Sequence, residues 1–263
     1  MNIAIFCNNS RGLKVINFLK KKYNIRLIFF SKKHLNKKTY GIVKTKKIKC
    51  TIIKSLNSQK IYYQIKKGNI DINVIAGFPY IFNNKMINSA KFGTLNLHAG
   101  KLPEYRGGSP LNWQIINNEK KIGISIIKIN KKIDDGKLVA KSIFKISHKD
   151  NIISITKKAE NKFLKIIEKG IKNLVDKKFL RKFGKSSYYR QRNNSDSEII
   201  FKKMTALEIQ NLVRACKYPY NAFYKKNNLK KYIKKVIIIR KKDLKFYNEK
   251  YIFYCKKGQI FLK

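Results

Sequence analysis

The chain has 263 residues, of which 62 are lysine or arginine and 14 are aspartate or glutamate, and its formal net charge is +48. Hydrophobic residues make up 43% of it, so it can bury a core, and its length is typical of one large domain or of a main domain with a small one. It has no apolar run near the roughly 20 residues of a membrane-spanning helix and no leader of the signal-peptide type, so we expect a cytoplasmic protein with no membrane partner.

The excess of lysine has two explanations. The functional one is an RNA, membrane or polyphosphate partner. The other is coding bias, because Ile and Asn are also abundant and the lysines are spread along the whole chain. We favour bias as the main source of the charge, with an anionic substrate as a smaller contribution.

The four cysteines show no metal-binding or disulfide pattern. Cys7, Cys50, Cys216 and Cys255 lack CxxC spacing, so we expect neither a metal site nor a disulfide framework. Cys7 and Cys50 lie in apolar runs and are interpreted as reduced core residues.

The first part of the chain alternates short apolar runs with helical patterns, which is typical of βαβ units around a parallel sheet. We expect strands over 2–7, 25–30, 51–53, 72–76 and 95–98, helices over 13–22, 59–66 and 110–116, and an irregular lysine-rich stretch over 31–49. A strand pair over 122–129 and 138–146 follows, and apolar residues at 3.6 spacing predict a long helix over 152–175.

The texture changes after that helix. Residues 186–197 are polar, and β-rich runs over 236–239, 251–255 and 259–262 predict a small β domain or partial barrel. The sequence therefore predicts an α/β fold with a mostly parallel sheet over residues 1–190, followed by a small β-rich domain over 191–263.

Two polar side chains end one of the predicted strands. Asn96 and His98 are two residues apart, so on a strand they face the same side, and in doubly wound folds ligands bind beyond the carboxyl ends of strands. On position alone, His98 is equally well explained as a hydrogen-bonded core histidine. Gly100, Gly107 and Gly108 follow and allow the backbone to approach a ligand closely, which favours a site.

Further candidates follow this pair in the sequence. Arg106 is either a fork-shaped donor for phosphate or carboxylate, or a solvated loop cation. Tyr105 and Trp113 have rings able to stack on a flat ligand, although Trp113 at helical spacing is more often a core residue. The turn at Asp134 and Asp135 supplies a carboxylate, and turn chemistry alone does not choose between the two.

Together these residues resemble the signature of the folate-dependent formyltransferases. The resemblance rests on Asn96-x-His98, Leu102-Pro103-x-Tyr105-Arg106-Gly107, Pro110 and Ile133-Asp134-Asp135-Gly136. That family uses an Asn-x-His pair with an Asp from a turn, so the resemblance implies Asn96, His98 and Asp134 as catalytic residues. It also implies a Rossmann-like catalytic domain, an OB-like C-terminal domain, and N10-formyltetrahydrofolate as co-substrate, with no metal.

A second stretch resembles the family's folate pocket. Residues 73–82 look like the strand and loop that shape this pocket, which implies Phe78, Pro79, Tyr80 and Ile81 as residues that bind the co-substrate. The chain departs from the family where Ala99-Gly100 replaces the frequent Pro-Ser or Gly-Ser. It departs again where Asp196-Ser-Glu-Ile199 replaces Asp-Gly-x-Ile before the C-terminal domain.

Two further segments bear on the acceptor. Pro110-Leu-Asn-Trp113 and Tyr188-Tyr-Arg-Gln-Arg192 look most like the enzymes that formylate nucleotide-linked amino sugars, which are often homodimers. In that interpretation Arg106 and Tyr105 bind the substrate. Arg11 does so as well, from the start of the helix after the first strand, or is a surface cation.

Two other classes remain as alternatives. Methionyl-tRNA formyltransferases, which act on initiator Met-tRNA, usually begin with Gly-x-Pro-x-Phe, where this chain has Cys7-Asn-Asn-Ser-Arg-Gly12. A non-catalytic basic RNA-binding protein is the third class, and it would not need Asn96, His98 and Asp134 together.

The implied reaction needs a proton acceptor and oxyanion donors. An amine that attacks the formyl carbon creates a tetrahedral oxyanion, which Asn96 and His98 would stabilise by roughly 2.7–4 kcal/mol per good donor. His98 is also suited to take the amine proton, because an imidazole pKa lies near working pH. Asp134 would set the state of His98 and relay a proton through water. The sequence does not assign the order of these steps.

Overall fold

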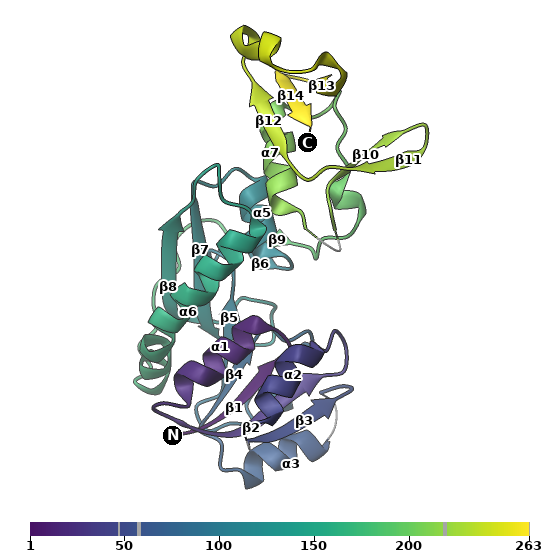
Figure 1. Ribbon diagram of the computed structural model, residues 1–263. Coiled ribbons are helices and arrows are strands. Elements are labelled where there is room, and N and C mark those ends of the chain that lie inside the picture. The colour runs from purple at the N-terminus through teal and green to yellow at the C-terminus, as the bar shows by residue number, and fades with distance from the viewer. Residues whose placement is uncertain (47, 57–58, 218–219, 263) are drawn as a thin grey trace. The chain divides into compact units, whose positions relative to one another are not determined.

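The computed structural model of the protein describes residues 1–46, 48–56, 59–217 and 220–262. Within these ranges, one large sheet has the strand order β3-β2-β1-β4-β5-β7-β8 (Figure 1). Its strands are β1 (Asn2–Cys7), β2 (Asn24–Ser31), β3 (Lys49–Ile53), β4 (Ile72–Ala76), β5 (Thr94–His98), β7 (Lys121–Lys128) and β8 (Lys137–Lys145). Strands β1 to β5 pair in parallel, and β7 runs antiparallel to β5. The predicted Rossmann-like fold with a mostly parallel sheet is confirmed.

Both faces of β1 are buried, because its side chains alternate between two layers. On one face Phe6 stacks on Phe29, with 4.7 Å between ring centroids, in a cluster that also receives Ile61 and Ile65 of helix α3 (Gln59–Lys67). On the other face lies helix α1 (Ser10–Leu19), where a Cβ on Gly12 would lie 2.2 Å from the Cβ of Cys7. Glycine at position 12 therefore allows α1 to approach the sheet.

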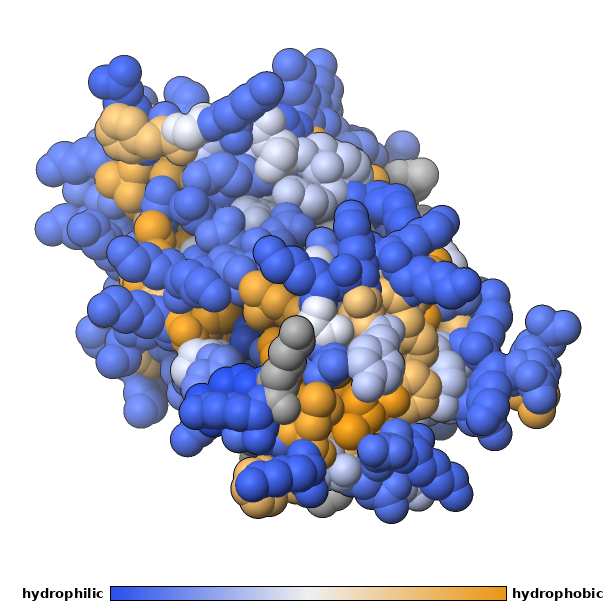
Figure 2. Space-filling view, turned by 90° about the horizontal axis from the view of Figure 1, so that it is seen from above, coloured by the Kyte–Doolittle hydropathy of each residue, from blue (hydrophilic) through white to orange (hydrophobic). Residues whose placement is uncertain are grey.

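The remaining helices are α2 (Lys37–Lys44), α4 (Asn84–Ile87), α5 (Pro110–Ile116), α6 (Ile152–Val175) and α7 (Ala206–Ala215). Short 3-10 turns lie at Ser195–Ser197, Lys241–Phe246 and Glu249–Tyr251. None of the described helices has the length and apolar character needed to cross a membrane. On the face seen in Figure 2, hydrophilic residues predominate, with smaller apolar patches between them.

The chain divides into two compact units. The first comprises residues 1–106, 123–142 and 159–186, and it contains most of the large sheet. The second comprises residues 107–122, 143–158 and 187–263. Because the second unit takes in segments from three parts of the chain, its bounds differ from those of a domain that begins at residue 191, and that domain division stays a prediction.

The C-terminal part contains strands, as predicted. The hairpin of β10 (Phe223–Lys226) and β11 (Leu229–Tyr232) forms one sheet, and β12 (Val236–Ile239), β14 (Gln259–Leu262) and β13 (Ile252–Tyr254) form another. Apolar side chains of α7 and β12, including Ile209, Val213 and Val236, share a core. A further two-stranded sheet joins β6 (Arg106–Gly107) with β9 (Tyr188–Tyr189).

Some sequence predictions of local structure were wrong. Residues 31–49 were expected to be irregular, but α2 forms within them, with the side chain of Asn36 accepting a hydrogen bond from the backbone N–H of Thr39 at 2.8 Å. This capping bond starts the helix despite its low apolar content. The first helix begins at Ser10 instead of residue 13. Helix α7 and the β10–β11 hairpin were not predicted.

Candidate functional site

The predicted catalytic residues lie together at the carboxyl end of β5. Asn96 and His98 share one side of the strand, and Asp134 reaches them from the loop between β7 and β8. The Asn96 Nδ2 donates to Asp134 Oδ1 at 3.1 Å, and the His98 Nδ1 lies 3.3 Å from Asp134 Oδ2. Residues 38 positions apart in sequence thus form one polar cluster, which we call the Asn96–His98–Asp134 cluster.

The imidazole of His98 is buried and held at both nitrogens. Its Nε2 lies 2.5 Å from the backbone carbonyl of Tyr105, and its Nδ1 faces Asp134. Burial lowers the pKa of His98, against the raising effects of Asp134 and the Tyr105 carbonyl, while Arg11 lowers it further. A carbonyl oxygen can only accept, so Nε2 carries a hydrogen and Nδ1 faces the carboxylate with a lone pair or a shared proton.

Gly100 makes this arrangement sterically possible. A Cβ at this position would lie 2.3 Å from both His98 Nε2 and the Tyr105 carbonyl oxygen. The sequence predicted that this glycine lets the backbone approach a ligand, whereas in the structure it makes room for the imidazole of His98.

The structure distinguishes the two aspartates of the turn. Asp134, at a φ of 49°, directs its carboxylate to Asn96 and His98. The carboxylate of Asp135 instead lies 3.6 Å from both Arg106 Nη1 and Lys182 Nζ. Turn chemistry left the choice open, whereas the geometry assigns Asp134 to the cluster.

Arg106 fastens the loop that carries these aspartates. Its Nε donates to the Ile133 carbonyl at 3.0 Å, and its Nη1 donates to Ser186 Oγ at 3.3 Å. Tyr105 is buried, and its carbonyl contacts His98. Both were predicted to bind substrate, a role that stays a prediction, and in the structure both contact the Asn96–His98–Asp134 cluster or its supporting loop.

Arg11 lies behind β5. Its Nη1 donates to the Leu97 carbonyl at 3.1 Å, and its guanidinium lies 5.1 Å from the ring centroid of Phe163. Glu160, which accepts from Ser10 at 2.7 Å, raises the pKa of Arg11, although burial lowers that pKa more strongly. Arg11 thus anchors the backbone between Asn96 and His98.

The four residues expected to bind folate split into two pairs. Phe78 and Tyr80 are half-buried, with ring centroids 5.4 Å apart, and Phe78 also meets Phe6 at 5.5 Å. Pro79 and Ile81 are exposed, with Ile81 at 74%. The segment therefore combines an anchored aromatic pair with an outward apolar side chain.

Ser125, which supports the loop after β5, was not among the residues predicted from the sequence. Ser125 on β7 lies opposite His98. Its Oγ donates to the Gly100 carbonyl at 2.8 Å and accepts from the Leu102 N–H at 3.2 Å. A single hydroxyl within the apolar run 122–127 was the available signal, because a buried polar group needs a partner.

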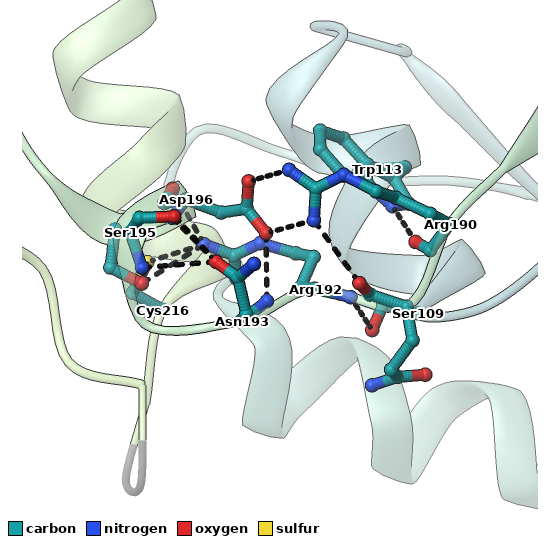
Figure 3. A network of polar contacts seen from close by, with 10 residues as sticks. Ser109, Trp113, Arg190, Arg192, Asn193, Ser195, Asp196 and Cys216 are labelled. Carbon is teal, nitrogen blue, oxygen red and sulfur yellow. Dashed lines mark hydrogen bonds and ion pairs between the residues drawn. The ribbon is translucent and has the colours of Figure 1, made fainter.

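The two segments that look like amino-sugar enzymes lie together in the second unit. The Trp113 Nε1 donates to the Arg190 carbonyl at 2.9 Å, and the Arg192 N–H donates to Ser109 Oγ at 3.3 Å. Figure 3 shows this network, in which the buried Arg192 also reaches Cys216 Sγ at 3.3 Å and Arg190 pairs with Asp196. These contacts join α5, the 188–192 segment and the end of α7.

Comparison with known proteins identifies the family. Residues 8–169 match the family model described as "Formyl transferase". The chain is 35% identical over 173 residues to a methionyl-tRNA formyltransferase of Sulfurihydrogenibium, covering 64% of this chain and 55% of that protein. Across the curated relatives first matched, the chain spans between 33% and 60% of their lengths.

Solved structures share the fold along the whole chain. WlaRD, described as a sugar 3N-formyl transferase in the presence of dTDP and 5-N-formyl-THF, has a TM-score of 0.73 at 22% identity, covering 100% of this chain and 97% of its own. A methionyl-tRNA formyltransferase from Clostridium thermocellum has a TM-score of 0.61 at 20% identity, with coverage of 100% and 97%. Since the family model spans more than half of its residues, the chain belongs to the formyl transferase family.

Proposed function

We propose that this protein transfers a formyl group from N10-formyltetrahydrofolate to the primary amine of a nucleotide-linked amino sugar. The observation that carries the proposal is the Asn96–His98–Asp134 cluster, in which one carboxylate contacts both the amide and the imidazole. Family membership supports the reaction class.

The residues of the first unit fit a folate co-substrate. The aromatic pair Phe78 and Tyr80 is fixed against the core beyond the end of β4, while Ile81 offers an exposed apolar side chain. Such surfaces suit a flat, partly apolar ligand. When bound, the co-substrate supplies the formyl group. In the described part of the chain, no group of three or more His, Cys, Asp or Glu could hold a metal ion.

The cluster can stabilise the negative charge that forms during the transfer and can accept the proton that the amine loses. Attack by the amine forms the new C–N bond and places negative charge on the formyl oxygen, and cleavage of the bond to N10 completes the transfer. Asn96 uses one amide hydrogen on Asp134, so its second can donate to that oxygen. The proton lost by the amine can be held between His98 Nδ1 and Asp134 Oδ2, and N10 takes up a proton as it leaves.

The lowered pKa of His98 suits the role of proton acceptor. Burial, the main cause of the shift, disfavours the imidazolium. Lowering the pKa of His98 favours the neutral imidazole, which is the form able to accept a proton. Arg11 adds to this by placing a buried cation near the ring, which further favours the neutral form of the proposed base.

Two observations support an amino-sugar acceptor. WlaRD, a sugar 3N-formyl transferase, matches nearly end to end, with 97% of its chain covered. The segments Pro110-Leu-Asn-Trp113 and Tyr188-Tyr-Arg-Gln-Arg192, which look like amino-sugar enzymes, contact one another through Trp113. A nucleotide-linked sugar also brings negative charge, which fits a chain of net charge +48.

Initiator Met-tRNA is the second candidate acceptor. It is favoured by the 35% identity to a methionyl-tRNA formyltransferase, the class of most of the curated relatives first matched, and by the same positive charge. The chain spans 55% of that relative's length, so the comparison leaves out nearly half of the relative.

An acceptor assay tests both proposals. The purified full chain is incubated with N10-formyltetrahydrofolate and, separately, a dTDP-amino sugar, a UDP-amino sugar and Met-tRNA, with products identified by mass spectrometry. We expect formylated amino sugar, lost in His98→Ala and retained in the exposed control His34→Ala. If only Met-tRNA is formylated, the acceptor is initiator Met-tRNA and not a nucleotide-linked amino sugar. Absence of any formylated product with all three acceptors would contradict the proposed function.

A further inference from the structure

The second unit contains a cavity that the proposed reaction does not use. Its volume is about 630 Å³, and three segments distant in sequence form its walls: residues 148–152 before and at the start of α6, residues 210–217 at the end of α7, and residues 234–237 at the start of β12. We call it the basic cavity. A volume of this size is within the range of small-molecule sites.

Positive charge converges on the basic cavity from all three segments. Its described lining includes five cations and no carboxylate: Lys149, Arg214, Lys217, Lys234 and Lys235. The nearest acid in sequence, Asp150, is already engaged, because Lys158 Nζ lies 2.7 Å and 2.8 Å from its two oxygens and the Ser147 N–H donates to it at 2.9 Å. Lys158 therefore offsets part of the negative charge that Asp150 presents to the cations of the cavity.

Arg214 distinguishes the basic cavity from the lysine-rich surface elsewhere on the protein. It lies in the last turn of α7, half-buried, and burial lowers its pKa despite the raising effect of Asp150. Its Nε is buried and has no hydrogen-bond partner in the described structure. A buried donor without an acceptor is costly, and a phosphate oxygen is the acceptor that a guanidinium binds best.

The cavity also has an apolar wall. Val213 and Val236 belong to the core shared by α7 and β12, and Ile237 continues this wall along the strand. An inorganic anion would contact only the cations, whereas a phosphorylated organic molecule would use both surfaces. This combination favours a small molecule with a phosphate group and an apolar part.

We propose that the basic cavity binds a phosphorylated small molecule of the nucleoside diphosphate class, with its phosphates at Arg214 and Lys234 and its organic part against Val213 and Val236. The cavity shares no residue with the Asn96–His98–Asp134 cluster. The inference therefore does not depend on the acceptor of the formyl group.

Calorimetric titration of the full chain tests this proposal. The probes are dTDP, inorganic tripolyphosphate and unphosphorylated thymidine. We expect dTDP to bind, thymidine not to bind, and Arg214→Gln to weaken the affinity for dTDP by about tenfold or more, as for loss of a charged hydrogen bond. The double variant Lys234→Gln/Lys235→Gln keeps the test valid if Arg214→Gln does not fold.

Two control variants decide the outcome. Lys230→Gln/Lys231→Gln on the exposed strand β11 removes the same charge outside the cavity and should leave affinity unchanged. His98→Ala should also leave it unchanged. Equal weakening by the β11 and cavity variants would overturn the proposal in favour of general charge. Unaltered dTDP binding in both cavity variants would place the nucleotide elsewhere, and binding of a short RNA in place of dTDP would replace the small molecule by nucleic acid.

Discussion

The two units hold an arginine in contrasting ways. In the first unit, Arg11 is supported by the protein itself, through the Leu97 carbonyl, the Phe163 ring and nearby Glu160. In the second, Arg214 lies in the last turn of α7 beside a cavity lined with lysines. The buried Nε of each arginine lacks a hydrogen-bond partner in the described structure, so the two differ in their surroundings and not at this atom. An arginine that donates to a backbone carbonyl of its own unit can position that backbone, whereas one that lies among lysines is suited to an external anion.

The largest loss of activity is expected in the first unit, where the side chains of the cluster bind one another, and it is expected at Asp134. Asp134→Asn replaces the carboxylate shared by Asn96 and His98 with an amide, so we expect kcat to fall about 10³-fold, the range for losing a proton relay and an orienting partner. Steady-state formyl transfer measures it. Asp135→Asn, on the same turn but facing Arg106 and Lys182, is the matched control. Equal losses in both variants would assign the effect to the turn instead of to Asp134.

A smaller but still large effect is expected at Gly100. In Gly100→Ala the new Cβ would lie 2.3 Å from His98 Nε2 and the Tyr105 carbonyl, so the ring or the loop must move. We expect kcat to fall roughly 100-fold, as for a displacement of about 1 Å at a catalytic group. Gly41→Ala, where no atom lies within 4 Å of the added Cβ, should leave activity unchanged. A Gly100→Ala enzyme with normal kcat would show that the His98–Tyr105 contact is dispensable.

The sequence predicted those parts of the fold and site that depend on local pattern. Strand β4 at 72–76 and helices α5 at 110–116 and α6 at 152–175 lie where they were expected, because apolar periodicity is strong there. The cluster of Asn96, His98 and Asp134 was also predicted, but through family resemblance, since spacing alone left the histidine and the aspartate ambiguous.

Other features were missed for two different reasons. Helix α7 had a readable signal, a capping box in which Thr205 and Glu208 bond reciprocally. No sequence signal identified the partner in the contacts of Arg106 with Ile133 and of Ser125 with Gly100, because each joins residues more than 20 positions apart and depends on how the sheet is ordered. Long-range polar contacts of this kind follow from the fold and not from the spacing of the residues.

Arg11 acts on the protonation of His98, and the pH dependence of the reaction can measure that effect. Burial is the main cause of the lowered pKa of His98, and Arg11 contributes in the same direction. Arg11→Gln should therefore raise the pKa of His98, so more of the ring is protonated at acidic pH and the acid limb of the kcat/KM profile moves to higher pH. Lys14→Gln, which loses the ion pair to the same Glu160, is the control and should not move the limb. A profile unchanged in Arg11→Gln would limit this residue to holding the Leu97 carbonyl.

The smallest effect is expected in the second unit, on the stability contributed by Asp150, which pairs with Lys158. Hydrogen bonds from Lys158, Ser147 and Ser154 bring the pKa of Asp150 to about 2, against the opposing effect of burial. A carboxyl with a lowered folded pKa contributes stability above its unfolded pKa, near 3.9, and loses it as pH falls towards 2. Asp150→Asn should lower the melting temperature at pH 7 by about 2–4 °C, as for roughly 1 kcal/mol in a chain of this size. This difference should shrink as the pH approaches 2, whereas Asp243→Asn, at an exposed pair with Arg240, should change little at either pH. A pH-independent difference would mean that Asp150 stabilises the protein through packing and not through its ion pair with Lys158.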